Sequence, residues 1–335
     1  MKKDDVKSGR VPYRHRGRIL HFRRLFSLLS ESFIYDTARE MLDRKLTVSA
    51  LSLVRLHSRA RPFPGNALLQ LDRLYRPEGL FARRLAVRFG ACEWDSYLWP
   101  VWRTYLRRSI RCLRPAIIHA HFGPDGCLVM PLAKTEGIPL AVSFYGYEVS
   151  RLIRHDEDRW RRRYARLFEY AGALIAISDH IAQRLVDLGA PPEKIRRIPL
   201  GCRLERFRYR AAAADDHGGT VRCLHVGRLT PKKAPMTLIK AFALARERLA
   251  GRVRLELKIV GEGELETACR HEIDRQGLAG SVSMAGSVSH RHIPRILAGA
   301  HIYTQHCLTP PDGDMEGLGV SFVEASASGL PVVTT

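Results

Sequence analysis

The run Val221-Arg-Cys-Leu-His-Val226, continued by Gly227-Arg-Leu-Thr-Pro-Lys-Lys233, decides the fold. Its first part is rich in apolar and β-branched residues and predicts a strand, which ends at a glycine and a basic loop. Residues 235–249 have the apolar spacing of a helix, and 254–260 again resemble a strand. Strand, helix and strand in this order predict a parallel βαβ unit, so we expect an α/β fold.

The same alternation extends in both directions from this unit. In the second half we expect helices at 264–276, 292–298 and 320–328 and strands at 282–285, 302–305 and 331–335. In the first half we expect a helix within 31–45 and strands at 46–56, 116–122, 140–146 and 173–178. Residues 61–114 are not assigned. Because the sequence stops inside an apolar run, we expect the second sheet to be incomplete at its C-terminus.

Two Rossmann-like domains are expected. Residues 211–219 lack apolar periodicity and end in two glycines, which is typical of a linker. We therefore predict a basic leader at 1–18, a first domain at 19–210, a linker at 211–219 and a second domain at 220–335.

Composition restricts the class of partner. The chain has 55 lysines and arginines against 34 acidic residues, a net charge of +21, which favours an anionic partner such as a phosphorylated substrate, acidic lipid or nucleic acid. Its seven cysteines are scattered without a C-x-x-C pair, which argues against disulfides and a zinc site and fits the cytoplasm. We find no apolar run of about 18 residues that would span a membrane.

The most specific motif is Glu316-Gly-Leu-Gly-Val-Ser-Phe-Val-Glu324. Glycines before a helix leave backbone N–H groups free at its positive end, so Gly317, Leu318 and Gly319 are candidates to bind a diphosphate. Glu316 is placed to face the group attached to that diphosphate. An isolated pair of this spacing is more often a surface acid and a solvated helix residue.

A second group of candidates lies on the loop after the 221–226 strand. Gly227, Arg228 and Lys233 follow the carboxyl end of that strand, where open α/β sheets bind ligands. Basic loop residues are common in a chain this basic, so the pair is weak evidence alone. The strand-to-turn sequence Ile259-Val-Gly-Glu-Gly263 adds Gly261 and Gly263, again a weak signal alone.

Together these motifs resemble the donor domain of the family 4 glycosyltransferases. The order is V-G-R-x-x-x-K-K, then V-G-x-G, then E-G-x-x-x-x-x-x-E-A-x-A-x-G-L-P-V-V. The segment Pro311-Asp-Gly-Asp-Met-Glu316 is similar to a subgroup that makes bacterial exopolysaccharides such as colanic acid. The resemblance implies the GT-B architecture, two Rossmann-like domains facing a central cleft. Ala234 departs from the family, in which glycine commonly follows the paired lysines.

The first half resembles the acceptor side of the same family. The relevant segments are Leu29-Ser-Glu-Ser-Phe-Ile34, which contains Ser30 and Glu31, His119-Ala-His-Phe-Gly-Pro-Asp125, Ser143-Phe-Tyr-Gly-Tyr-Glu148 and Ala176-Ile-Ser-Asp-His180. We expect His119 and His121 to point to opposite faces of their strand, with His121 and nearby Asp125 facing the cleft; a purely structural His121 is equally consistent. Tyr145 stands where family members often carry a histidine beside the reacting sugar, and tyrosine is a poor base near neutral pH.

The resemblance also implies roles. Glu324 would hold the donor ribose, Glu316 the sugar, and Arg228, Lys233 and the 317–319 amides the diphosphate of a UDP- or GDP-sugar. Transfer would retain the anomeric configuration and need no cofactor or metal. The implied acceptor is a lipid-linked glycan in capsule or exopolysaccharide synthesis. Basic segments at 103–114 and 151–166 favour a cytoplasmic protein resting on the anionic inner face of the plasma membrane, although a solvated helix face explains them equally.

Three alternatives remain at this stage. A nucleic-acid-binding protein fits the charge, but no zinc spacing, RNA-binding motif or recognition helix supports it, so no specific nucleic acid is expected. A catalytically silent GT-B scaffold fits an incomplete second sheet. A related activity such as a nucleotide-sugar epimerase would use the same donor groups.

Overall fold

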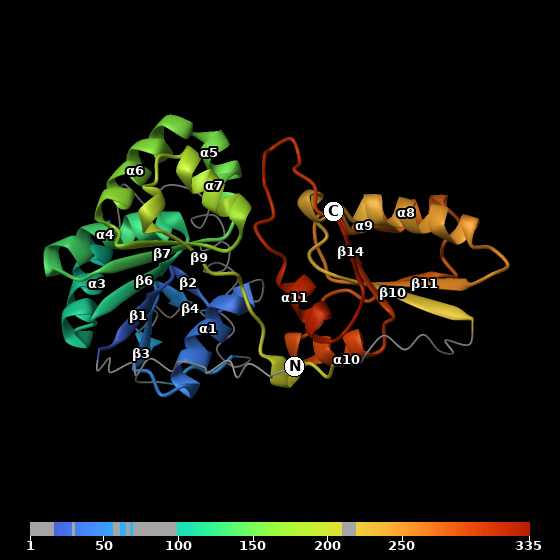
Figure 1. Cartoon of the computed structure of the whole chain (residues 1–335), viewed down its shortest axis with the longest axis horizontal. Helices are drawn as coiled ribbons and strands as arrows, with labels where there is room; N and C mark the ends of the chain where they lie inside the picture. The colour runs from blue at the N-terminus through green and yellow to red at the C-terminus, as the bar shows by residue number, and fades with distance from the viewer. Residues whose placement is uncertain (1–16, 29–30, 56–60, 65–67, 70–98, 210–218) are drawn as a thin grey trace, which may run out of the picture.

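The computed structural model describes residues 17–28, 31–55, 61–64, 68–69, 99–209 and 219–335. Most of its strands belong to two parallel sheets, one from each half of the chain (Figure 1). The α/β class and the pair of Rossmann-like units are therefore confirmed. The expected leader and linker lie largely outside the described residues, so the domain boundaries stay predictions.

The first sheet has seven parallel strands in the order β5-β3-β1-β6-β7-β8-β9. Along the chain this order reads 3-2-1-4-5-6-7, which is doubly wound, with the order reversing between β1 and β6. β7 is buried along its whole length, as expected of a central parallel strand. The strands are β1 (Ile19–Phe22), β3 (Val48–Leu51), β5 (Leu68–Leu69), β6 (Ile117–His121), β7 (Leu140–Phe144), β8 (Ala173–Ala176) and β9 (Ile195–Arg197).

Helices cover both faces of this sheet. On one face Ile34 and Ala38 of α1 pack against Val48 and Ala50 of β3. On the other face α3, α4, α6 and α7 share one large apolar cluster with the strands. The helices are α1 (Ser32–Asp43), α3 (Trp99–Leu113), α4 (Gly123–Glu136), α5 (Arg151–His155), α6 (Glu157–Tyr170) and α7 (Asp179–Asp187), with 3-10 turns η3 (Tyr147–Val149), η4 (Pro192–Lys194) and η5 (Leu204–Arg206).

Local sequence sets several of these helix ends. The Asp156 side chain accepts a hydrogen bond from the Arg159 amide, and the Ser178 hydroxyl accepts one from the Ile181 amide, so both residues cap the helices that follow them. Gly137 ends α4 in the left-handed conformation that glycine adopts at low cost. These caps fix where α6 and α7 start and where β7 can begin.

The second sheet has five parallel strands in the order β12-β11-β10-β13-β14. Along the chain this order reads 3-2-1-4-5, so it reverses between β10 and β13. The strands are β10 (Thr220–Val226), β11 (Arg254–Val260), β12 (Val282–Met284), β13 (Ile302–Gln305) and β14 (Val332–Thr334).

Two apolar clusters cover the faces of the second sheet. α8 and α9 pack on one face with Leu255, Leu257 and Ile259 of β11. α10 and α11 contribute to the other, around Leu224 and Tyr303. The elements are α8 (Pro235–Arg248), α9 (Glu266–Arg275), α10 (Ile293–Ala298) and α11 (Val320–Ala327), with 3-10 turns η6 (Pro231–Lys233) and η7 (His290–His292).

The expected elements of the second half are confirmed to within two residues at their ends, but the first half needs corrections. The single strand expected at 46–56 is wrong, because the chain turns after β3 and Val54–Arg55 (β4) pairs instead with Leu25–Phe26 (β2) in a separate two-stranded sheet. The sequence analysis also missed β1, which lies inside the first sheet between β3 and β6. Part of the unassigned 61–114 region forms α3.

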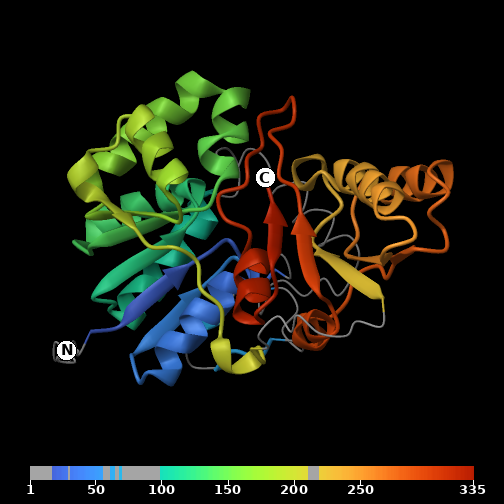
Figure 2. The same cartoon turned by 45° about the vertical axis from the view of Figure 1, so that its right-hand side comes forward.

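The two sheets are joined by contacts of the loop that precedes α11. The Met315 amide donates to the Ser150 hydroxyl at 3.3 Å, and Arg151 pairs with Asp312 at 3.2 Å. Figure 2 shows the helix α11 between the two sheets, with this loop beside the α5 region. The carboxyl-end loops of β7 and β13 therefore meet. Within the described part of the chain, none of the helices combines the length and apolarity that crossing a bilayer requires.

Candidate functional site

The first part of the site lies at the carboxyl end of β10. Arg228 is exposed there, and its guanidinium has no hydrogen-bond or ion-pair partner among the described residues. Lys233 in η6 is buried, and its Nζ lies 2.9 Å from Glu316 Oε2. Lys232 pairs in parallel with Asp314 at 3.1 Å. Two lysine–carboxylate pairs thus hold the loop before α11 against the loop after β10.

The start of α11 has no side-chain cap. Its N-cap is Gly319, which has no side chain to occupy the free N–H groups of the first turn. Gly317 lies against the first domain, where a Cβ atom would collide with the Tyr145 carbonyl. Leu318 packs against the apolar core of the first domain. The glycine pattern therefore has a packing reason at Gly317 and leaves a helix N-terminus uncapped at Gly319.

Glu324 lies one turn into α11 and is buried. Its Oε1 is 2.6 Å from Nε2 of His290, in the turn η7. Arg206 lies on the opposite side of this ring, with Nη1 3.4 Å from Nδ1. Sequence reasoning missed His290 and Arg206, because neither belongs to a recognisable motif.

A buried polar pair lies beneath Gly227. His225 is fully buried, and its Nδ1 lies 3.3 Å from the Thr304 carbonyl. Its Nε2 has no hydrogen-bond partner in the part of the chain that the structure describes. Burial lowers the pKa of His225 to about 4, so the imidazole is neutral at pH 7. Gln305 beside it accepts hydrogen bonds from the Tyr303 and Ser321 hydroxyls. This network links β10, β13 and the start of α11.

Gly261 and Gly263 bring the loops after β10 and β11 together. A Cβ on Gly261 would collide with the Gly227 carbonyl, and a Cβ on Gly263 with that of Leu229. The Gly227 amide donates to Val260 and the Leu229 amide to Glu262, both at 3.0 Å. Both glycines therefore have a packing role. That they also contact a nucleotide-sugar donor stays a prediction.

In the first sheet, the loop after β1 carries charged side chains that are paired. Arg23, just after β1, donates to Glu31 at 2.7 Å and to Asp125 at 2.9 Å. Arg24 also pairs with Asp125. Burial alone would raise the pKa of the Asp125 carboxyl, but the charges of Arg24 and Arg23 outweigh it and hold that pKa below its ordinary value. The carboxylate expected beside His121 is thus bound by two arginines.

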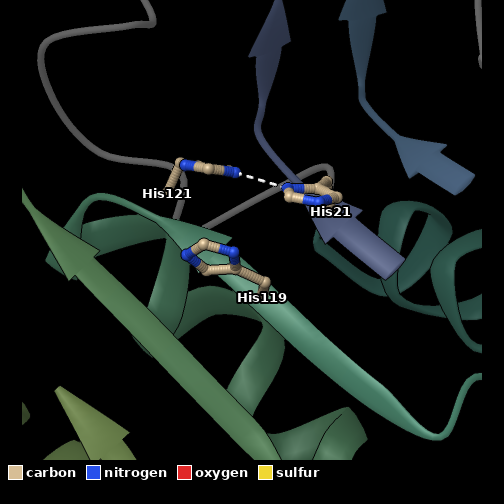
Figure 3. Close-up of side chains that lie close together, drawn as sticks. All are labelled: His21, His119 and His121. Atoms are coloured by element: carbon tan, nitrogen blue, oxygen red, sulfur yellow. Dashed lines mark hydrogen bonds between the residues drawn. The ribbon is translucent and has the colours of Figure 1, made fainter. Parts of the chain in front are cut away.

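Three histidines gather next to these charges, His21 from β1 and His119 and His121 from β6 (Figure 3). The expectation that His119 and His121 point to opposite faces is wrong, because residues two apart on a strand share a face. Their ring centroids are 4.4 Å apart. His121 Nε2 lies 2.9 Å from His21 Nδ1, and its Nδ1 lies 2.6 Å from the Tyr145 hydroxyl.

These histidines form a candidate metal site by distance, since one nitrogen from each lies within 4.8 Å of the others. Burial lowers the pKa of all three, that of His119 to about 4, so the rings are neutral. However, nitrogens of the three rings already pair with one another or with Ser143, Tyr145 and Met41. The positive charge of Arg23 also disfavours a cation here. The arrangement is that of a hydrogen-bonded network.

The turn after β7 carries Tyr145. Its amide and that of Gly146 donate to the buried Glu148 carboxylate at 2.7 and 3.0 Å. Burial raises the pKa of Glu148 to about 7 and raises the pKa of Tyr145. The Tyr145 ring packs between Phe33 and Phe122. Tyr145 is therefore a hydrogen-bonding group, and a base only at high pH.

The structure thus brings Arg228, Lys233, Glu316, Gly317 and Glu324 to one edge of the second sheet. Glu31, Asp125, His121 and Tyr145 gather at the matching edge of the first sheet. Ser30 lies outside the described residues. The roles expected for these residues in donor and acceptor binding stay predictions.

Comparison with known protein families matches both halves of the chain. Residues 30–206 match the model described as Glycosyltransferase Family 4, and residues 215–335 match the one described as Glycosyl transferases group 1.

Curated relatives include proteins of polysaccharide synthesis. WcaL of Salmonella typhimurium, provisionally assigned as a colanic acid biosynthesis glycosyltransferase, is 33% identical over 218 residues, 64% of this chain and 52% of that protein. The amylovoran biosynthesis glycosyltransferase AmsK of Erwinia amylovora is 32% identical over 246 residues, 69% of this chain and 58% of that protein. The chain thus spans about half the length of the curated relatives it matches.

Solved structures share the fold. Anabaena Alr3699/HepE, crystallised with UDP and glucose, superposes with a TM-score of 0.67 over 95% of this chain and 80% of that chain, at 17% identity. The sucrose-phosphate synthase of Thermosynechococcus elongatus superposes with a TM-score of 0.66 over 95% of this chain and 81% of that chain, at 15% identity. At these identities the likeness is one of fold, and it agrees with the GT-B architecture.

Proposed function

Because the chain belongs to glycosyltransferase family 4, we propose that it transfers a sugar from a nucleotide-sugar donor to a glycan acceptor. The observation that carries this proposal is the edge of the second sheet between β10 and β13. This edge carries Arg228, which has no partner among the described residues, together with the buried Lys233 and the start of α11, which no side chain caps. A diphosphate would supply negative charge to Arg228 and to the free amides of α11, next to the Lys233–Glu316 pair.

In the proposed complex the donor lies across the second domain. The diphosphate faces Arg228, Lys233 and the α11 amides, and the ribose faces Glu324. Glu316, which pairs with Lys233 at 2.9 Å, would face the sugar. Relatives named as GDP-mannose-dependent enzymes and HepE with bound UDP both support a nucleotide-sugar donor.

The chemistry follows from these charges. The bond between the anomeric carbon and the diphosphate oxygen breaks, and the diphosphate leaves with the electron pair. A new bond forms between the anomeric carbon and the acceptor oxygen, and the acceptor's hydroxyl proton passes to the departing diphosphate oxygen. Fixed cations and helix amides stabilise the leaving group most as its charge grows, so they lower the barrier. We infer retention of the anomeric configuration and no metal requirement from the family resemblance.

We further propose a lipid-linked acceptor in exopolysaccharide synthesis, as the names of WcaL and AmsK suggest. Exposed arginines of α6, Arg161, Arg162 and Arg166, would face an anionic membrane. Sedimentation with vesicles of phosphatidylglycerol, compared with neutral phosphatidylcholine, tests this surface. Equal sedimentation with both vesicle types contradicts it.

Saturation-transfer NMR with UDP-, GDP- and ADP-sugars tests the donor proposal. We expect one nucleotide class to bind the parent chain, and we expect Arg228→Ala and Glu324→Ala to abolish the signal. Arg248→Ala and Glu247→Ala are the matched controls, because both side chains are exposed on α8.

The outcomes separate the alternatives. Binding that is lost only in the two site variants supports the donor site, and product analysis then separates a transferase from an epimerase. A folded parent chain that binds none of the three donors supports a silent scaffold instead. Binding that survives Arg228→Ala and Glu324→Ala would mean that the donor lies elsewhere.

A further inference from the structure

His290 is the one side chain that the structure places in hydrogen-bonding contact with the Glu324 carboxylate among the described residues. The ring nitrogen Nε2 lies 2.6 Å from Glu324 Oε1. The Glu324 side chain is only 6% exposed and that of His290 24%. A contact this short between a buried carboxylate and a ring constrains the rotamer of both groups.

Arg206 decides which ring nitrogen of His290 carries the hydrogen. Its Nη1 lies 3.4 Å from Nδ1, and its Nη2 donates to the His290 carbonyl at 3.3 Å. A guanidinium has only donors, so Nδ1 must accept, and in the neutral ring the hydrogen then sits on Nε2. His290 therefore donates to Glu324, and Arg206 fixes the tautomer that does so.

The contact leaves part of the carboxylate for a ligand. An ionised carboxylate has two oxygens with about four acceptor sites, and His290 uses one of them. The two hydroxyls of a ribose are donors that fit the remaining sites. A carboxylate that is already oriented loses less rotamer freedom when it binds a diol.

We propose that His290 is a positioning residue that orients Glu324 to accept the ribose hydroxyls of the donor. The proposal rests on the proposed function, since it assumes a nucleotide at this edge. Arg206 acts one step further away, through the His290 tautomer. The turn η7 thereby becomes part of the donor site, although no motif marks it.

Calorimetric binding of UDP and GDP, compared with their 2′,3′-dideoxy forms, tests this role in the whole chain. We expect His290→Ala to weaken binding of the ribonucleotide about tenfold, the scale of one hydrogen bond to a charged group, and to leave dideoxynucleotide binding unchanged. His290→Gln should restore part of the affinity, because its side-chain amide also donates. His292→Ala, exposed in the same turn, should have no effect.

The outcomes distinguish this proposal from the one on which it rests. An equal loss for ribo- and dideoxynucleotides, or no loss in His290→Ala, overturns the positioning role while nucleotide binding by the parent chain stands. If Glu324→Ala is likewise unselective, Glu324 does not bind the ribose and the positioning role fails with it. A folded parent chain that binds neither UDP nor GDP overturns both proposals.

Discussion

The two sheets reverse their strand order at equivalent places, between β1 and β6 in the first and between β10 and β13 in the second. The charged side chains at these two places differ in whether they are paired. At the first, Arg23, Glu31 and Asp125 are bound to one another. At the second, Arg228 has no partner among the described residues, and His225 keeps a buried nitrogen unpaired.

This difference shows that the strand order fixes where a crevice lies, while the side chains determine whether it can bind a ligand. The same strand order creates a crevice at both places. Breaking a buried ion pair leaves an uncompensated charge and costs stability, whereas an exposed donor without a partner, such as Arg228, is available to a ligand. We therefore expect substitutions at the first crevice to change stability and those at the second to change binding and catalysis.

The largest expected effect is on stability at the first crevice. Asp125→Ala leaves Arg23 and Arg24 short of a buried partner, so we expect unfolding to become easier by about 3–5 kcal/mol. Urea denaturation measures this change. Asp179→Ala is the control, because that carboxylate pairs with Arg197 at 3.0 Å while its side chain is 82% exposed, and such pairs contribute little. Equal effects of the two substitutions would contradict the comparison.

At the second crevice the expected effect is on catalysis. Arg228→Ala removes a cation from the leaving diphosphate, and we expect kcat/KM to fall about 10²- to 10³-fold. The free energy of unfolding should not change, because Arg228 has no partner to lose among the described residues. Release of nucleoside diphosphate measures the rate, with Arg248→Ala as control. A loss of stability without a loss of rate would place Arg228 with the structural charges.

We expect the buried histidines of both sheets to make the free energy of unfolding depend on pH in the acid range. Burial lowers the pKa of His119 and of His225 from 6.5 to about 4. The unfolded chain takes up these protons first, so each group's contribution is complete above pH 6.5 and is lost as the pH falls toward 4. We expect each histidine to contribute about 3 kcal/mol to that loss.

Urea denaturation between pH 7 and pH 4 measures this dependence. His119→Gln and His225→Gln should each flatten it, one in each sheet, because glutamine does not titrate. We expect the first sheet to retain more of its acid sensitivity in His119→Gln, since His21 and His121 remain. Parallel curves for the parent and both variants would show that these rings are not the titrating groups.

The sequence predicted the second crevice better than the first. Between 220 and 335 the strands alternate with helices of ordinary length, and the ligand-binding residue types follow strand ends, so periodicity and motif spacing agree. Arg228, Lys233, Glu316 and Glu324 were predicted in this way, and the structure places them at one edge of the second sheet, while their roles stay predictions. His290 and Arg206 were not, because they approach Glu324 only through tertiary packing.

The strands and charge pairs of the first crevice were predicted less well, for physical reasons. β1 has only four residues and β3 ends after four, too few for a periodic signal, so one central strand was missed and another was drawn too long. Pairing between Arg23 and Asp125 joins positions 102 residues apart, which no local pattern reveals. The strand placement of His119 and His121 was right, and the error lay in assigning them opposite faces.

The smallest expected effect separates packing from ligand contact at the second crevice. Gly261 has φ of 141° and leaves no room for a Cβ atom beside Gly227, whereas Gly280 has open space around it. We expect Gly261→Ala to destabilise the chain by about 1–3 kcal/mol and Gly280→Ala to leave it unchanged. Urea denaturation measures both, and nucleotide titration of the folded variants adds the second readout. If Gly261 serves only to bring the loops after β10 and β11 together, the affinity for the nucleotide should fall only in step with the loss of stability. A Gly261→Ala chain that keeps its stability but loses nucleotide binding would instead make this glycine part of the ligand contact.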